Sequence, residues 1–131
     1  PLRVYNVHLD TRINAGERIQ QLSAVIEHAG ESEGTVVVGG DLNSNNFLWL
    51  RRVIPIPFVG RQVKRMTRYM AKHDFISPFE SFERGTHEMF NLKLDWIFAR
   101  GAEFLDAEIE IVGFSDHRLI WAKIGEGSPD S

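Results

Sequence analysis

The chain has 131 residues, of which 43% are hydrophobic and 11% aromatic, enough apolar material for the core of one domain. A formal net charge of −3 excludes a general electrostatic affinity for nucleic acid, because non-specific phosphate binding needs concentrated lysine and arginine. The absence of cysteine excludes disulfides, thiolate metal sites and a cysteine nucleophile. No stretch is long and apolar enough to span a membrane, so we expect a soluble protein and favour the cytoplasm.

Hydrophobic periodicity predicts three elements in the first part of the chain: a strand over Leu2–Leu9, a helix over Glu17–Ala29 and a buried strand over Thr35–Val38. Gly30 is the expected C-cap of the helix, and Gly39 and Gly40 are expected to end the second strand. Because the strand pattern starts at Leu2 with no leading loop, we expect further chain before Pro1.

Two helices are predicted in the middle of the chain. Asn46 is expected to cap a short helix that runs through Arg52 and is stopped by Pro55 and Pro57. The segment from Gly60 to His73 predicts an amphipathic helix, since it has apolar residues on one face and basic residues on the other. The basic residues are Arg61, Lys64, Arg65 and Arg68.

Three strands are predicted in the last part of the chain, over Leu92–Ala99, Glu103–Val112 and Leu119–Ile124. Residues 125–131 are small and polar, and we expect them to form a frayed tail. Strands and helices thus alternate before three final strands, which favours a single α/β domain over residues 1–124 with a mixed, mostly antiparallel sheet.

Polar residues that can carry chemistry lie at or within these strands: His8, Asp41, Asn43, Asp95, Asp116 and His117. Each one alone is explained equally well by a turn, a cap or a surface position. Taken together, three carboxylates, two histidines and an amide suit metal-assisted hydrolysis of a phosphate ester. A carboxylate binds Mg²⁺, a second carboxylate or a histidine handles the proton of the attacking water, and further donors stabilise the transition state.

Four segments resemble successive motifs of the endonuclease/exonuclease/phosphatase superfamily, which includes pancreatic-type deoxyribonucleases, abasic-site endonucleases, inositol polyphosphate phosphatases and neutral sphingomyelinases. The segments are Asn6-Val7-His8-Leu9, Gly40-Asp41-Leu42-Asn43-Ser44, Leu94-Asp95-Trp96-Ile97-Phe98 and Ser115-Asp116-His117-Arg118. Arg18 and Gln21 match the Arg-x-x-Gln pattern that follows the first motif in the family. The resemblance covers Leu2 to about Ile124.

The resemblance implies a role for each site residue. His117 is the catalytic histidine and is oriented by the carboxylate of Asp95. Asp41 activates or positions water, and it is open whether Asp41 or His117 takes the proton. Asp116 joins Asp41 as a ligand of Mg²⁺ or Mn²⁺. Two further residues contact the substrate: Asn43 holds a phosphate oxygen or the nucleophile, and His8 donates to the scissile phosphate.

The resemblance also implies a four-layer α/β/β/α sandwich of which this chain matches only the C-terminal half, with helices on one face of its sheet. The other half carries the glutamate that is a principal metal ligand, so we expect the metal to be held weakly. A half sandwich leaves one apolar sheet face uncovered. We therefore expect either the missing N-terminal half or a homodimer to cover it, with Val4, Val36 or Val38 near the seam.

Two functions remain open. The first is a divalent-metal phosphoesterase, either a nuclease or a phosphatase, and the second is a non-catalytic half-domain that self-associates and has at most a binding or scaffolding role. The substrate is a nucleic acid, an inositol phosphate or a phospholipid head group. The basic helix face fits a polyanion, but a solvated surface accounts for it as well. Asn45, Asn46, Trp49 and Arg51 form an alternative substrate-reading loop.

Overall fold

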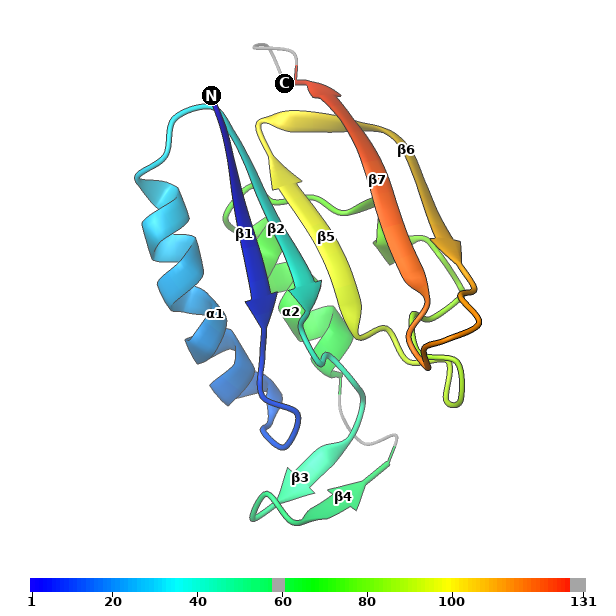
Figure 1. Ribbon diagram of the computed structural model, residues 1–131. Helices are drawn as coiled ribbons and strands as arrows, with labels where there is room; N and C mark the ends of the chain where they lie inside the picture. The colour runs from blue at the N-terminus through cyan, green and yellow to red at the C-terminus, as the bar shows by residue number, and fades with distance from the viewer. Residues whose placement is uncertain (58–60, 128–131) are drawn as a thin grey trace.

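The computed structural model describes residues 1–57 and 61–127 (Figure 1). In chain order the elements are β1 (Leu2–His8), α1 (Ala15–Gly30), β2 (Thr35–Asp41), β3 (Leu48–Leu50), β4 (Ile54–Ile56), α2 (Gln62–Ala71), the 3-10 helix η1 (Pro78–Glu80), β5 (Asp95–Arg100), β6 (Ala102–Glu110) and β7 (Leu119–Glu126). The predicted α/β class is confirmed. No helix in the described ranges has the length and apolar character needed to cross a lipid bilayer.

The central sheet has three strands in the order β1-β2-β5. β1 and β2 are parallel, because α1 returns the chain to the starting end of the sheet, and β5 is antiparallel to β2. A single bridge between Ile76 and Ala99 continues the pairing on the outer edge of β5. β6 and β7 form a separate antiparallel hairpin beside β5. The mixed sheet agrees with the sequence prediction.

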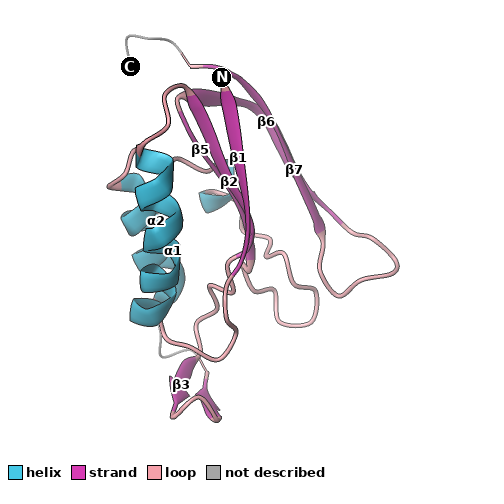
Figure 2. Cartoon of the chain, turned by 60° about the vertical axis from the view of Figure 1, so that its left-hand side comes forward, coloured by secondary structure: helices cyan, strands magenta, loops and turns pink. Residues whose placement is uncertain are grey.

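Both helices cover the same face of the central sheet, as Figure 2 shows. Leu22 and Ile26 of α1 and Met66 and Met70 of α2 are buried against the strand residues that point toward them: Val36, Val38, Trp96 and Phe98. The alternation of buried and half-buried residues along β2 follows from the two-residue period of a strand. The apolar core therefore lies between this sheet face and the helices.

In the described part of the chain, no helix covers the opposite face of the central sheet (Figure 2). Leu2 and Val4 of β1 are exposed there, and a shallow groove runs past Val4, Val37 and Ile97 to β7. The prediction that Val36 or Val38 lies on this face is wrong, because both side chains are fully buried on the helical side. Val37, between them, points the other way.

The predicted helix from Asn46 to Arg52 is also wrong, since this segment begins the β3–β4 hairpin. Arg51 and Arg52 both have positive φ, at 51° and 59°, which a right-handed helix excludes. The side chain of Asn14 replaces the helical pairing: it accepts a hydrogen bond from Trp49 N and donates one to Trp49 O, at 2.8 and 3.0 Å. Pro55 fits a two-stranded edge because it has no N–H to donate.

Several predicted boundaries shift. β2 continues through Gly39 and Gly40 to Asp41, so the two glycines do not end the strand. The predicted strand from Leu92 starts only at Asp95, because Thr86 Oγ1 accepts hydrogen bonds from the backbone N–H groups of Leu94 and Asp95 and ties this stretch to a loop. α1 is capped by Glu31 rather than Gly30. β7 extends to Glu126, so the predicted tail is shorter than expected, and residues 128–131 lie outside the described part, as does Gly60.

The sidedness of the sheet predicts unequal costs for two leucine-to-alanine substitutions. Leu22 is completely buried between α1 and the sheet, whereas Leu2 is 61% exposed on the open face. We expect Leu22→Ala to lower the free energy of unfolding by about 2–5 kcal/mol, because it leaves a cavity in the core. Leu2→Ala should change it by less than about 0.5 kcal/mol. Urea unfolding measures both values, and equal effects would contradict the layering.

Candidate functional site

Three candidate residues lie side by side where the parallel strands end. In the strand register His8 is opposite Asp41, and Asp41 is opposite Asp95. Directly opposed residues point to the same side of a sheet, and this is the side without helices. His8 Nε2 lies 3.8 Å from Asp41 Oδ2. One imidazole and two carboxylates therefore lie in a row at the end of the central sheet where β1 and β2 finish and β5 begins.

The end of β2 is shaped by Gly40. Its φ is +130°, and a Cβ at this position would collide with the carbonyl oxygen of Val7 on β1. Only glycine therefore allows β2 to pair closely with β1 up to Asp41. Beyond the strand, Asn43 adopts φ 48°, and its backbone N–H donates to Asp41 Oδ1 at 2.8 Å. This hydrogen bond fixes the Asp41 carboxylate.

The role of Asn43 at a phosphate stays a prediction, and its contacts in the structure are with neighbouring parts of the protein. The side chain is 3% exposed, and its Nδ2 donates to the carbonyl oxygen of Leu9 at 2.8 Å. It thereby joins the loop after β2 to the loop after β1. Asn43 acts on the site through Asp41 and Leu9, as a residue that holds both loops in place.

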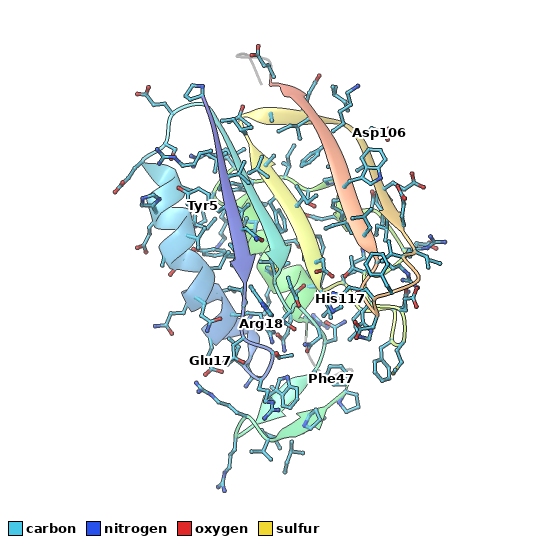
Figure 3. The ribbon with its side chains drawn as sticks, viewed as in Figure 1. Tyr5, Glu17, Arg18, Phe47, Asp106 and His117 are labelled. Atoms are coloured by element: carbon cyan, nitrogen blue, oxygen red, sulfur yellow. The ribbon has the colours of Figure 1, made fainter. Side chains whose placement is uncertain are left out.

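Asp95 and His117 form the closest side-chain pair of the site. Asp95 Oδ2 lies 2.8 Å from His117 Nδ1, within hydrogen-bond distance, so the carboxylate is placed to orient the ring as the resemblance implies. Asp95 is the first residue of β5, and Thr86 Oγ1 fixes its backbone by accepting from its N–H at 2.9 Å. Figure 3 shows His117 at the same end of the molecule as the ends of β1 and β2. Residues 22 positions apart are thus joined into a carboxylate–imidazole dyad.

The charges of the site act on one another. Burial lowers the pKa of His117, but the hydrogen bond and charge of Asp95, with smaller contributions from Asp41 and Asp116, outweigh it and leave the pKa above its ordinary value. The pKa of Asp41 is raised, mainly by burial and also by the Asp95 carboxylate, against the hydrogen bond from Asn43. Two carboxylates that face each other at a sheet edge favour a positive charge between or beside them.

Asp116 lies beside the dyad and points to solvent. Asp116, His117 and His87, which lies between η1 and β5, each place one possible ligand atom within 4.8 Å of the others. The loop that contains His87 is paired with the segment before β7 by two backbone hydrogen bonds. Glu88 N donates to Asp116 O at 2.9 Å, and Arg118 N donates to Thr86 O at 2.7 Å. All six predicted residues are therefore connected at one end of the fold.

A buried arginine supports the site from the helical side. The Arg18 guanidinium donates to the carbonyl oxygens of Asp10 and Thr11, in the loop after His8, and to Oε1 of Gln62 on α2. Gln62 in turn donates to the carbonyl oxygen of Phe47, which precedes β3. Burial lowers the pKa of Arg18 to about 10. Figure 3 shows Arg18 and Phe47 at the same end as His117, so one network holds the loops around the site.

The donor atoms present fit a hard divalent cation. Asp41, Asp95 and His117 place one ligand atom each within 4.8 Å of one another, and a second such group joins His117 to His87 and to the exposed carboxylate of Asp116. Magnesium is usually held by one or two carboxylates together with water and substrate phosphate. Asp41 offers a free carboxylate in the first of these groups, because Asp95 is already engaged by His117, and Asp116 offers one in a second group that shares only His117 with the first.

Sequence reasoning missed Thr86 and His87. Both lie in a segment whose composition indicates only a loop, and their importance arises from contacts with Asp95 and Asp116 that are distant in sequence. The basic residues of α2 and its N-cap are exposed. Asn45 is buried and caps a turn by accepting from Phe47 N, so it is not part of an open substrate-reading loop.

Comparisons with known proteins identify the fold. No protein-family model and no curated protein match the sequence. The structure of a functionally unknown conserved protein from Enterococcus faecalis V583 aligns with 95% of this chain over 50% of its own length, with a TM-score of 0.64 and 20% sequence identity. The structure of an endonuclease/exonuclease/phosphatase family protein from Bacteroides thetaiotaomicron aligns with 92% of this chain over 47% of its own length, with a TM-score of 0.56 and 15% sequence identity. The chain spans about half the length of both structures and shares the fold of that half.

The dyad predicts a change in histidine titration. In Asp95→Asn the carboxylate charge is lost while burial of the ring remains, so the pKa of His117 should fall below its value in the unaltered protein. Because that pKa is raised on folding, the pair stabilises the fold most below the unfolded pKa of about 6.5, and this contribution is lost as the pH rises through the folded pKa. NMR titration of the ring measures the shift, and an unchanged pKa would exclude the dyad.

Proposed function

We propose that the protein hydrolyses phosphate ester bonds with the help of a divalent cation, and that this chain is the C-terminal half of an endonuclease/exonuclease/phosphatase four-layer sandwich. The observation that carries the proposal is the Asp95–His117 pair at 2.8 Å beside Asp41 and His8. The fold shared with the Bacteroides protein over about half its length supports the same superfamily.

Three residues act on the proton, the water and the phosphate. Asp95 holds the His117 ring through Nδ1, which leaves Nε2 free to exchange a proton with the attacking water or the leaving oxygen. Asp41 positions the water, since Asn43 fixes one of its two oxygens and the other stays available. His8 is exposed next to Asp41 and donates to a phosphate oxygen.

Asp116 and Asp41 are the proposed ligands of Mg²⁺ or Mn²⁺. When bound, the cation polarises the phosphoryl group. We expect two carboxylates alone to hold it weakly, since magnesium keeps most of its water and needs near-octahedral oxygen ligands. Nucleic acids, inositol phosphates and phospholipid head groups all offer the phosphate ester that these residues would contact.

Hydrolysis of p-nitrophenyl phosphate and bis(p-nitrophenyl) phosphate by the protein at its full natural length tests this function. We expect activity with Mg²⁺ or Mn²⁺ that EDTA removes. His117→Gln and Asp41→Asn should each lower it by about 10²–10⁴-fold, the usual contribution of a general acid or base. His73→Gln is the control, because His73 lies exposed at the end of α2. Activity that survives both site substitutions would refute the proposed mechanism.

The open sheet face supports a second candidate, a half-domain that functions through assembly. Leu2, Val4, Val37 and Ile97 form an apolar surface that a second sheet would bury, as in a four-layer sandwich. If the protein is the proposed phosphoesterase, the N-terminal half of such a sandwich covers this surface. If it is the half-domain, a second copy of this chain covers the surface, and the motifs are inherited without activity.

Sedimentation equilibrium of the 131-residue chain distinguishes the two covers. If a second copy covers the face, the chain is a dimer and Val4→Glu shifts it to monomer, because a buried unpaired charge is costly. Val53→Glu should not, since Val53 is 74% exposed on the β3–β4 turn, compared with 63% for Val4 on the sheet. A monomer at all concentrations would rule out self-association.

A further inference from the structure

We propose that His87, Asp116 and His117 form a binding site for a transition-metal ion, most closely suited to Zn²⁺, that shares Asp116 with the carboxylate site proposed for Mg²⁺ and differs from it in its two imidazole ligands. The three residues offer two imidazole nitrogens and one carboxylate oxygen that lie within 4.8 Å of one another. Imidazole ligands favour zinc and other transition metals, whereas magnesium prefers oxygen. Two histidines with one carboxylate and an open fourth position are a common zinc ligand set.

The spacing of the donor atoms fits ligands of one ion better than it fits a hydrogen bond. His87 Nε2 lies 3.5 Å from Asp116 Oδ2, longer than an ordinary N–H···O hydrogen bond. Two ligands at the usual zinc distances, at tetrahedral angles, lie about 3.3 Å apart. An ion between these two atoms would therefore need only a small movement of either side chain.

The state of His87 without a metal is unfavourable. Its Nδ1 is buried and has no hydrogen-bond partner among the described residues. If Nδ1 carries the proton, the lone pair of Nε2 faces the negative Asp116 carboxylate, and if Nε2 carries it, the Nδ1 lone pair stays unpaired in a buried position. A cation on Nε2 removes the repulsion between the lone pair and the carboxylate, and it leaves the buried Nδ1–H unpaired as in the first of these two states.

The backbone holds the three residues in place before any ion binds. His87 and His117 are paired in an isolated antiparallel bridge, and the flanking hydrogen bonds from Glu88 N to Asp116 O and from Arg118 N to Thr86 O lie on both sides of it. Their rings meet edge to face at 5.4 Å, and Phe90 stacks on the other side of His87. The ligands therefore do not depend on a flexible loop to come together.

His117 would be shared between the zinc site and the dyad. Its Nδ1 is bonded to Asp95, which leaves Nε2 for the metal and gives the carboxylate–histidine–zinc arrangement that orients many zinc ligands. An imidazole whose Nε2 is bound to zinc cannot exchange a proton there. It follows, if the proposed function holds, that zinc inhibits hydrolysis by occupying His117.

Titration calorimetry with ZnCl₂ tests the site directly. We expect one Zn²⁺ per chain and, with Co²⁺ as a substitute, the intense visible absorption of a four-coordinate ion. His87→Gln should weaken zinc binding at least about tenfold, and Asp95→Asn by about 10–100-fold through loss of the outer hydrogen bond. His73→Gln, which changes an exposed histidine outside the cluster, should bind as the unaltered protein does. Zinc binding that His87→Gln leaves unchanged would overturn the proposal.

NMR of the unaltered protein keeps the test decisive if His87→Gln fails to fold. Zinc should shift the ring signals of His87 and His117 together and leave those of His73 in place, and movement of His73 alone would overturn the site. Hydrolysis assays then separate the two proposals. Zinc binding without any hydrolysis supports the zinc site and contradicts the phosphoesterase function. Mg²⁺-dependent hydrolysis that zinc leaves unaffected supports the phosphoesterase function and contradicts the zinc site. Inhibition by zinc that is lost in His87→Gln supports both.

Discussion

The register of the three central strands is the constraint on which the site depends. β2 is paired on both sides, and its pairing puts His8, Asp41 and Asp95 at neighbouring positions. Because strand side chains alternate with a period of two, a slip of one residue would turn Asp41 toward the helices and bury its charge in the core. The backbone ladder and the apolar alternation of Val36 and Val38 thus fix the position of the carboxylates.

The same ladder would not suffice without support for the loops at its end. Arg18 and Gln62 join both helices to the loop after β1 and to the segment before β3, while Thr86 fixes the start of β5. A buried guanidinium is costly unless it is well paired, and here backbone carbonyls and an amide pair it. Arg18 and Gln62, which lie on the helical side of the sheet, therefore fix the positions of the loops that surround the candidate site.

The sequence predicted the elements that rest on local periodicity and the site residues that rest on motifs. It placed α1, α2 and the strands of the central sheet and of the β6–β7 hairpin within a few residues, and it paired Asp95 with His117. The β3–β4 hairpin could not be predicted, because Asn14, 35 residues away, decides the backbone of Trp49. His87 was invisible for the same reason: a lone histidine in a polar loop has no pattern until its long-range partners are known.

Because β2 lies between two partner strands, the residues of the site differ in how readily they move. β2 is hydrogen-bonded along both edges, whereas β1 has one open edge and His117 lies in the connection that precedes β7. Strands paired on both sides open least often, and connecting segments open most readily. Asp41 should thus remain fixed through fluctuations that separate His117 from Asp95. The carboxylates thus lie in a frame that is paired on both edges, whereas the imidazole is held by one short bridge to His87, so we expect the dyad to separate before the central sheet opens on mild heating.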